Sequence, residues 1–203
     1  MSAQYWLGAL ALASLAGGGC YAGSANAITP HEVAVQAAAD PGWVLVGRVP
    51  LIRQRATADC GAAALAMVLS FWTTPTSVAA IDARDPAAAA KGWRAGQLRD
   101  LALERGLDAF VISAGIDDLT REIRHGRPVV VGVVKRYGDR ALAHYQVVVG
   151  INPARGLILS LDPADGWRED SFAGFDREWM PSDRLAMMVL PRAAAAQRSP
   201  GAS

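Results

Sequence analysis

The sequence has little cysteine, little net charge and few glycine-rich motifs, and these absences exclude several classes of function. Among its 203 residues, 20 Lys and Arg are balanced by 19 Asp and Glu, so no basic stripe marks a nucleic-acid surface. There is no internal repeat and no glycine loop that could cradle a phosphate. The two cysteines do not settle the redox compartment. A hydrophobic content of 52 % fits one domain with a sizeable core.

Residues 1–27 are typical of a signal peptide or a lipoprotein signal. Residues 5–16 form an apolar stretch that is too short to span a bilayer, and small residues follow it. Two processing sites compete, because Cys20 resembles the acylated cysteine of a bacterial lipoprotein and Ala25-Asn26-Ala27 fits ordinary signal cleavage. We therefore expect a protein exported to the bacterial cell envelope, either lipid-anchored through Cys20 or periplasmic. An apolar N-terminus with no export role is the alternative.

The remainder divides into a linker, a domain and a tail. We expect residues 28–42 to be the linker, residues 43–191 the domain, and residues 192–203 a disordered tail. Either cleavage of the leader would acylate or remove Cys20 and leave Cys60 as a lone thiol. A lone thiol in an exported protein calls for an explanation.

Helical patterns dominate the first part of the domain and strand patterns the second. An extended or edge segment at residues 43–52 comes first, since it is apolar but contains a proline. Helices or helical turns are predicted at residues 59–71, 77–83, 87–90, 97–105, 117–124 and 172–179. Strands are predicted at residues 108–112, 128–134, 144–150, 157–161 and 185–190. Helices followed by an antiparallel sheet indicate an α+β domain.

Cys60 stands where a nucleophilic thiol would be mounted, at the start of a long helix-forming run. With Asp59 as N-cap, Cys60 occupies the first helical turn, where the macrodipole and free N–H groups favour a thiolate. The side-chain amide of Gln54 and the N–H of Cys60 can bind the oxyanion that such a thiol generates. Gly61 leaves space for a substrate backbone. Taken alone, a cysteine in an Ala-rich helix is most often core filler.

His144 and Asp162 flank the predicted turn at residues 152–156. If the turn centres on Pro153, His144 lies nine residues before the centre and Asp162 nine after it, so they face each other. An error of one in the centre would shift the partner by two residues. A histidine oriented by a carboxylate is the base that a thiol nucleophile requires. Asp162 precedes a proline and is therefore also a common turn starter.

The sequence around these positions resembles a known family. The segments that carry the resemblance are Gln54, Asp59-Cys60-Gly61-Ala62-Ala63-Ala64-Leu65, His144-Tyr145-Gln146-Val147-Val148-Val149-Gly150 and Asp162-Pro163-Ala164-Asp165-Gly166. They look like the bacteriocin-processing, double-glycine-leader cysteine peptidases, which are papain-like, over about residues 49–190. The resemblance implies that Cys60 is the nucleophile, His144 the general base, Asp162 the orienting acid and Gln54 the oxyanion-hole donor.

The best-known members of that family are domains of peptide-exporting ABC transporters that face the cytoplasm. We expect this chain to be a stand-alone relative in the cell envelope, whose substrate need not be a double-glycine leader.

The sequence thus predicts a papain-like α+β domain that cleaves a peptide or protein substrate without a metal or organic cofactor. Trp93, Trp167 and Tyr145 are candidates for lining its cleft. Two other functions remain open. One is a non-catalytic, membrane-tethered module that binds a peptide, although a full set of four site residues argues against it. The other is an amide or acyl transferase that uses the same triad.

Overall fold

The computed structural model describes residues 20–72 and 75–192 of the chain. Its helices are α1 (Pro30–Ala39), α2 (Cys60–Trp72), α3 (Val78–Asp82), α4 (Pro86–Lys91), α5 (Ala95–Glu104), α6 (Ile116–Arg124) and α7 (Phe172–Trp179), with 3₁₀ turns η1 (Thr57–Asp59) and η2 (Met180–Ser182). Its strands are β1 (Asn26–Ala27), β2 (Val44–Leu45), β3 (Leu107–Ser113), β4 (Val129–Tyr137), β5 (Arg140–Asn152), β6 (Leu157–Asp162), β7 (Gly166–Ser171) and β8 (Leu185–Pro191). Most helices precede most strands, and the predicted α+β class is confirmed.

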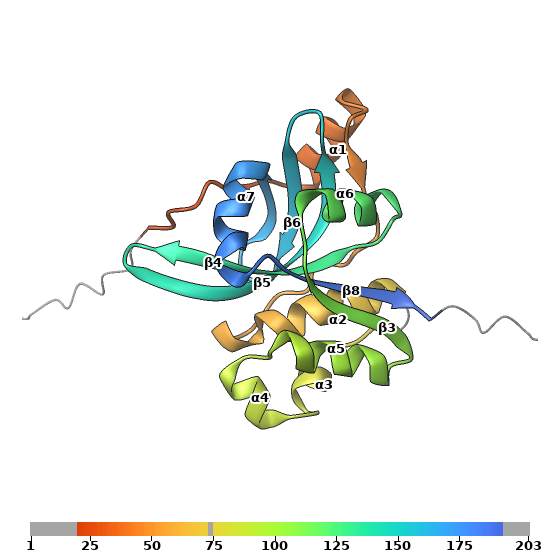
Figure 1. Cartoon of the computed structure of the whole chain (residues 1–203), viewed down its shortest axis with the longest axis vertical. Helices are drawn as coiled ribbons and strands as arrows, with labels where there is room; N and C mark the ends of the chain where they lie inside the picture. Colours follow the sequence, from red (N-terminus) through yellow and green to blue (C-terminus); the bar gives the residue numbers. More distant parts are fainter. Residues whose placement is uncertain (1–19, 73–74, 193–203) are drawn as a thin grey trace, which may run out of the picture.

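The strands of the described chain form an antiparallel sheet in the order β1-β7-β6-β5-β4-β8-β3, with β2 added to β5. Helices α2 to α5 gather on one side of the strands β4, β5 and β8, and α6 and α7 lie on the other side (Figure 1). Helix α2 packs directly on β5. The fold therefore brings the start of the first long helix against strands that come much later in the sequence.

Helix α2 is the centre of the core because it is apolar on every side. Its residues 60–69 are all buried, and such a helix is stable only when other elements enclose it. The sheet covers one side, and α3 and α5 cover others. Burial on all sides fixes the rotation of α2 about its axis, and with it the direction in which Cys60 points.

Strand β5 changes partners along its length. Its first part pairs with β4, where His144 lies opposite Val133, and its second part pairs with β6 from Val147 onward. A register shift between Val148 and Gly150 marks a bulge near the change. At His144, β5 therefore has β4 on one edge only, and the other edge is open toward α2 and the end of β6.

The range 28–42, which the sequence predicts as a linker, contains a helix. Thr29 caps α1, its side chain accepts the N–H of Glu32, and Glu32 reaches back to the N–H of Thr29. Pro30 takes the first helical position, where it loses no hydrogen bond. These local signals, rather than a packed apolar face, explain the helix, since Val33 is its one buried residue.

Two strands and one predicted extended segment differ from the sequence analysis. Strand β7 was not predicted, because Gly-Trp-Arg-Glu-Asp-Ser has no β-branched residue and forms a strand only by pairing with β6. Strand β1 lies within the predicted leader. Of the extended segment 43–52, only Val44–Leu45 pairs as a strand. Residues 1–19 of the leader and 193–203 of the tail lie outside the described residues. None of the described helices has the length and apolarity that crossing a membrane requires.

Candidate active site

Cys60 is the first residue of α2 and follows η1 without a break. Asp59 is not the N-cap of α2, which corrects the prediction. Its carboxylate accepts the backbone N–H of Ala56 at 3.0 Å and of Arg55 at 3.2 Å, because Asp59 ends a 3₁₀ turn and reaches back to that turn's start. The Asp59 carboxylate is thus engaged at the start of η1. The thiolate of Cys60 instead has the N–H groups of Gly61 and Tyr145 nearby.

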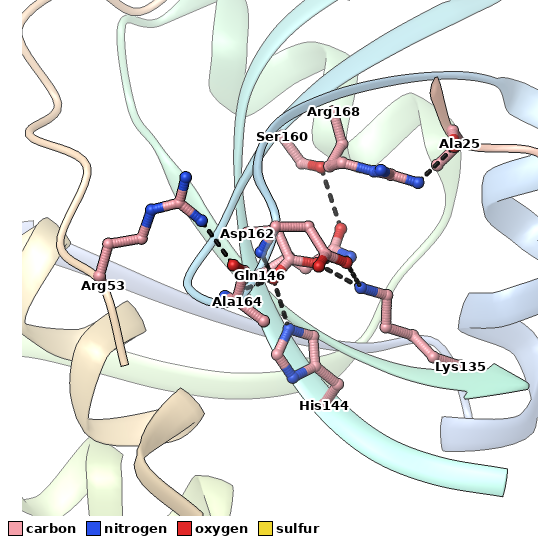
Figure 2. A network of polar contacts seen from close by, with 10 residues as sticks. Ala25, Arg53, Lys135, His144, Gln146, Ser160, Asp162, Ala164 and Arg168 are labelled. Atoms are coloured by element: carbon pink, nitrogen blue, oxygen red, sulfur yellow. Dashed lines mark hydrogen bonds and ion pairs between the residues drawn. The ribbon is translucent and has the colours of Figure 1, made fainter. Parts of the chain in front are cut away.

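His144 is 4 % exposed and lies between the thiol and a carboxylate. Its Nε2 is 2.8 Å from Oδ1 of Asp162 (Figure 2). The Cys60 thiol interacts with the same imidazole, and the two side chains line one cleft. With Nε2 engaged by Asp162, Nδ1 is the nitrogen left for the sulfur. The structure thus brings together three residues that are 84 and 18 positions apart in sequence.

His144 and Asp162 are diagonal neighbours and not direct partners, so the predicted register was wrong by two residues. Val147 pairs with Leu161, and the next position along the ladder puts Gln146 opposite Asp162. The bulge in β5 and the position of the turn account for the shift. The contact forms nevertheless, because diagonal side chains on one face of an antiparallel pair remain within reach of each other.

Asp162 serves the turn and the histidine with the same oxygen. Its Oδ1 accepts the N–H of Ala164 at 2.7 Å and of Asp165 at 3.1 Å, in addition to its contact with His144. The alternative interpretation of Asp162 as a turn starter is therefore compatible with the functional one. The turn holds the carboxylate in one rotamer, and that rotamer presents Oδ1 to the imidazole.

The other oxygen of Asp162 contacts two residues that sequence reasoning missed. Its Oδ2 accepts from Nζ of Lys135 at 2.6 Å and from Nε2 of Gln146 at 3.0 Å. Ser160 donates to Gln146 at 2.9 Å and fixes the orientation of that amide. Gln146 could have been found from its place two residues after His144, on the same face of the strand. Lys135 could have been found because it directly continues a run of valines that is predicted to be a buried strand.

The charges of this cluster stabilise one another. Burial acts to raise the pKa of the Cys60 thiol, but the hydrogen bond and charge of His144 outweigh it and lower that pKa below its usual value. Burial acts to lower the pKa of His144, yet Asp162 and Cys60 raise it to about 9. The charges of His144 and Lys135 overcome the burial of Asp162 and hold its pKa well below the usual range. These shifts favour the ionised forms of all three groups, the thiolate, the imidazolium and the carboxylate.

Gln54 lies beside the turn that carries Asp162. Its backbone N–H donates to the carbonyl of Pro163 at 3.1 Å, and the neighbouring Arg53 donates to the carbonyl of Ala164. The side-chain Oε1 of Gln54 is buried and has no hydrogen-bond partner in the described structure. The structure therefore groups Cys60, His144 and Asp162 at one site, and it connects Gln54 to them through the Asp162 turn.

A cleft of about 770 Å³ opens over the thiol and the imidazole. One wall comes from η1 and the loop before α5, and the other from the β4–β5 hairpin and η2. The residues that line it are Thr57, Ala58, Cys60, Lys91, Gly92, Trp93, Arg94, Ala95, Gly132, Val133, Val134, Leu142, Ala143, His144, Tyr145, Pro181, Ser182 and Leu185. Trp93 and Tyr145 line this cleft as expected, whereas Trp167 does not.

Gly61 is enclosed by protein and not by open space, which corrects the role predicted for it. A Cβ at this position would come within 3.2 Å of side-chain atoms of Leu98 and Tyr145 and 3.3 Å of Trp93. The missing side chain thus lets α2 approach Tyr145 closely, and this approach sets the distance between the thiol and β5. Among the described residues, no three His, Cys, Asp or Glu side chains are grouped in a way that could hold a metal ion.

A thiol at the start of a buried helix, faced by a histidine and an aspartate from an antiparallel sheet, defines the papain-like cysteine peptidase fold. The chain matches the Peptidase_C39 like family over residues 46–187, and it belongs to this family. Family and fold together indicate a cysteine peptidase. Among curated proteins, the comparison found no match.

Solved structures support the same assignment. The chain is similar to the peptidase domain of Streptococcus ComA, a bifunctional ABC transporter involved in quorum sensing, with 27 % identity, a TM-score of 0.58 and coverage of 71 % of this chain and 100 % of that one. Two others share the fold. A double glycine motif protease from an AMS/PCAT transporter, in complex with the leader peptide, has 24 % identity, a TM-score of 0.53 and coverage of 71 % and 92 %. A C39-like peptidase from Bacillus anthracis has 16 % identity, a TM-score of 0.60 and coverage of 75 % and 99 %.

Proposed function

We propose that this protein is a cysteine endopeptidase that cleaves a peptide or protein substrate in the bacterial cell envelope. The observation that carries the proposal is that Cys60 and His144 line one cleft and that His144 is held by the Asp162 carboxylate behind it. The surroundings shift both groups in the direction that nucleophilic catalysis requires, because they lower the pKa of the Cys60 thiol and raise that of the His144 imidazole.

The reaction proceeds by acyl transfer to the sulfur. The Cys60 thiolate attacks the substrate carbonyl carbon, and the oxyanion is bound by the side-chain amide of Gln54 and the N–H of Cys60. His144 then gives its proton to the leaving amine as the carbon–nitrogen bond breaks. Water, deprotonated by the same imidazole, attacks the thioester and releases the acid and the thiolate.

The shape of the cleft supports a peptide as substrate. It runs between Trp93 on one wall and Leu142 on the other, and its lining is largely apolar. Apolar walls with a few polar groups suit an extended peptide whose side chains alternate between the two sides. The similar protease from an AMS/PCAT transporter has a leader peptide bound.

Alkylation tests the ion pair directly. At pH 6 about 0.3 % of an ordinary cysteine is thiolate, so iodoacetamide should label Cys60 about tenfold faster than a free cysteine or more. The labelling should need a lower pH than that of a free cysteine, because the hydrogen bond and charge of His144 lower the pKa of Cys60, and His144 itself stays protonated up to about pH 9. Labelling of each cysteine is followed by mass spectrometry of the digested protein.

The exposed Cys20 provides the internal reference in the same sample, in protein purified without lipid. In the variant His144→Gln, the buried Cys60 should react no faster than Cys20. If Cys60 of the unmodified chain also reacts no faster than Cys20, the protein is a peptide-binding module with this fold and not an enzyme.

We also infer that the mature protein begins at Cys20 and is lipid-anchored there. The segment after Cys20 is built into the sheet: Ala22 donates to the carbonyl of Arg136, Ile28 donates to that of Trp167, and β1 pairs with β7. Cleavage after Ala27 would remove most of these contacts. Processing before Cys20 would keep all of them, including the bond from the N–H of Gly138 to the carbonyl of Cys20.

Mass spectrometry of the protein extracted from bacterial membranes should therefore find an acylated N-terminal Cys20. The variant Cys20→Ala should lose the lipid and leave the membrane fraction, because the acceptor thiol is gone. An N-terminus at Ile28 would contradict this inference and would leave the proposed peptidase activity unaffected.

A further inference from the structure

A lysine buried behind the catalytic candidates is not used by the mechanism above. Lys135 lies on β4 and is 1 % exposed. A buried ammonium is costly unless it is paired and hydrogen-bonded. Its Nζ donates to Asp162 and Asp165 and lies 5.5 Å from the centre of the Tyr21 ring, within cation–π range.

Strand register explains why this lysine reaches the site. Side chains alternate along β4, and the cross-strand partners of Val133 and Lys135 are His144 and Leu142. Lys135 and His144 therefore share one face of the β4–β5 hairpin. Both side chains extend to Asp162 at the end of β6, and Figure 2 shows them approaching the carboxylate together.

The carboxylate is consequently divided between two cations. Oδ1 of Asp162 contacts the imidazole of His144, and Oδ2 contacts the ammonium of Lys135. We propose that Lys135 is a positioning residue of the proposed peptidase site, which locks the Asp162 carboxylate toward His144 and weakens its hold on the imidazole proton. This inference rests on the proposed function, because it assigns Lys135 a part in that same reaction.

Weakening that hold serves the proton transfer. A buried carboxylate acting on His144 alone would bind the imidazolium proton so tightly that donation to a leaving amine would be slow. Lys135 offsets part of the carboxylate charge at short range, and it does so without entering the cleft. The ring of Tyr21, in the segment after Cys20, lies over the ammonium.

Other charged and titratable groups also influence the proton affinity of His144, so any test must leave them unchanged. The groups around Lys135 and His144 are Tyr21, Arg53, Cys60, Tyr145, Asp165, Arg168 and Glu178.

The variant Lys135→Met tests the proposal, because methionine has a similar length and no charge. We expect the proton affinity of His144 to rise about tenfold, which moves its titration, followed by NMR of the imidazole, up by about one pH unit. The alkaline limb of the kcat profile should move with it, and kcat near pH 7 should fall about tenfold. KM should change less than about twofold, since Lys135 does not line the cleft.

Arg136→Met is the matched control, because it removes the same charge from the next, exposed residue of β4 and should change none of these quantities. If Lys135→Met does not fold, Lys135→Gln decides the question, since it keeps a donor for Asp162 and loses only the charge. An unchanged His144 titration in the folded variant would overturn the proposal. That titration needs no substrate, so its outcome is separate from a failure of the peptidase proposal, which would show as an absence of Cys60-dependent cleavage.

Discussion

We expect Cys60→Ala to abolish peptide cleavage, with kcat/KM falling by about 10⁴-fold or more. The sulfur is the atom that bonds to the substrate, so no other group in the cleft can replace it. The fold should survive, because Cys60 heads a helix whose other buried residues are unchanged and His144 keeps its bond to Asp162. Cleavage of a peptide library, read by mass spectrometry, measures the loss. Circular dichroism verifies the fold.

Cys20→Ala is the control for this variant, since Cys20 is exposed and lies outside the cleft. Its cleavage rate should equal that of the unmodified protein. Undiminished cleavage by Cys60→Ala would locate the chemistry at another residue and would reject the proposed mechanism. Incorporation of an added amine in place of water would instead show a transferase that uses the same thiol.

The sequence was most informative where one residue type is required by local physics. The all-apolar run of α2 could only be a buried helix, and its first residue, Cys60, was placed correctly. His144 was identified because a histidine stood in a strand close in sequence to an aspartate at a turn. The fold class followed from the order of helical and strand patterns.

What the sequence could not provide was the register between strands. The turn centres between residues 154 and 155 rather than on Pro153, and a bulged residue in β5 moves the partners back by one, so the predicted direct pair is a diagonal one. Lys135 could not be assigned to Asp162 for the same reason, since that contact depends on the pairing of β4, β5 and β6 together. The strand β1 was missed because two residues carry no period.

Asp162→Asn should be nearly as damaging to activity as loss of the thiol, although it changes one oxygen to an amino group. An asparagine has one acceptor oxygen, whereas Asp162 accepts from His144 on one oxygen and from Lys135 on the other. In either orientation of the asparagine amide, its NH₂ group faces another hydrogen-bond donor, either the imidazole of His144 or the ammonium of Lys135. Turned toward the imidazole, it favours the tautomer with the proton on Nδ1, which cannot accept the proton of Cys60. We expect kcat to fall about 10⁴-fold.

The same variant should also destabilise the fold by about 3 kcal/mol, because Lys135 loses one of its two acidic partners while it stays buried. The pKa of Asp162 is held below its usual value, so its contribution to stability is present above about pH 4 and is lost as the pH falls. The stability difference between the two proteins, measured by urea unfolding, should therefore shrink on acidification. Asp117→Asn, at an exposed position of α6, is the matched control. If Asp162→Asn kept the activity and stability of the control, the imidazole would not depend on this carboxylate, and the proposed triad would be reduced to a Cys60–His144 pair.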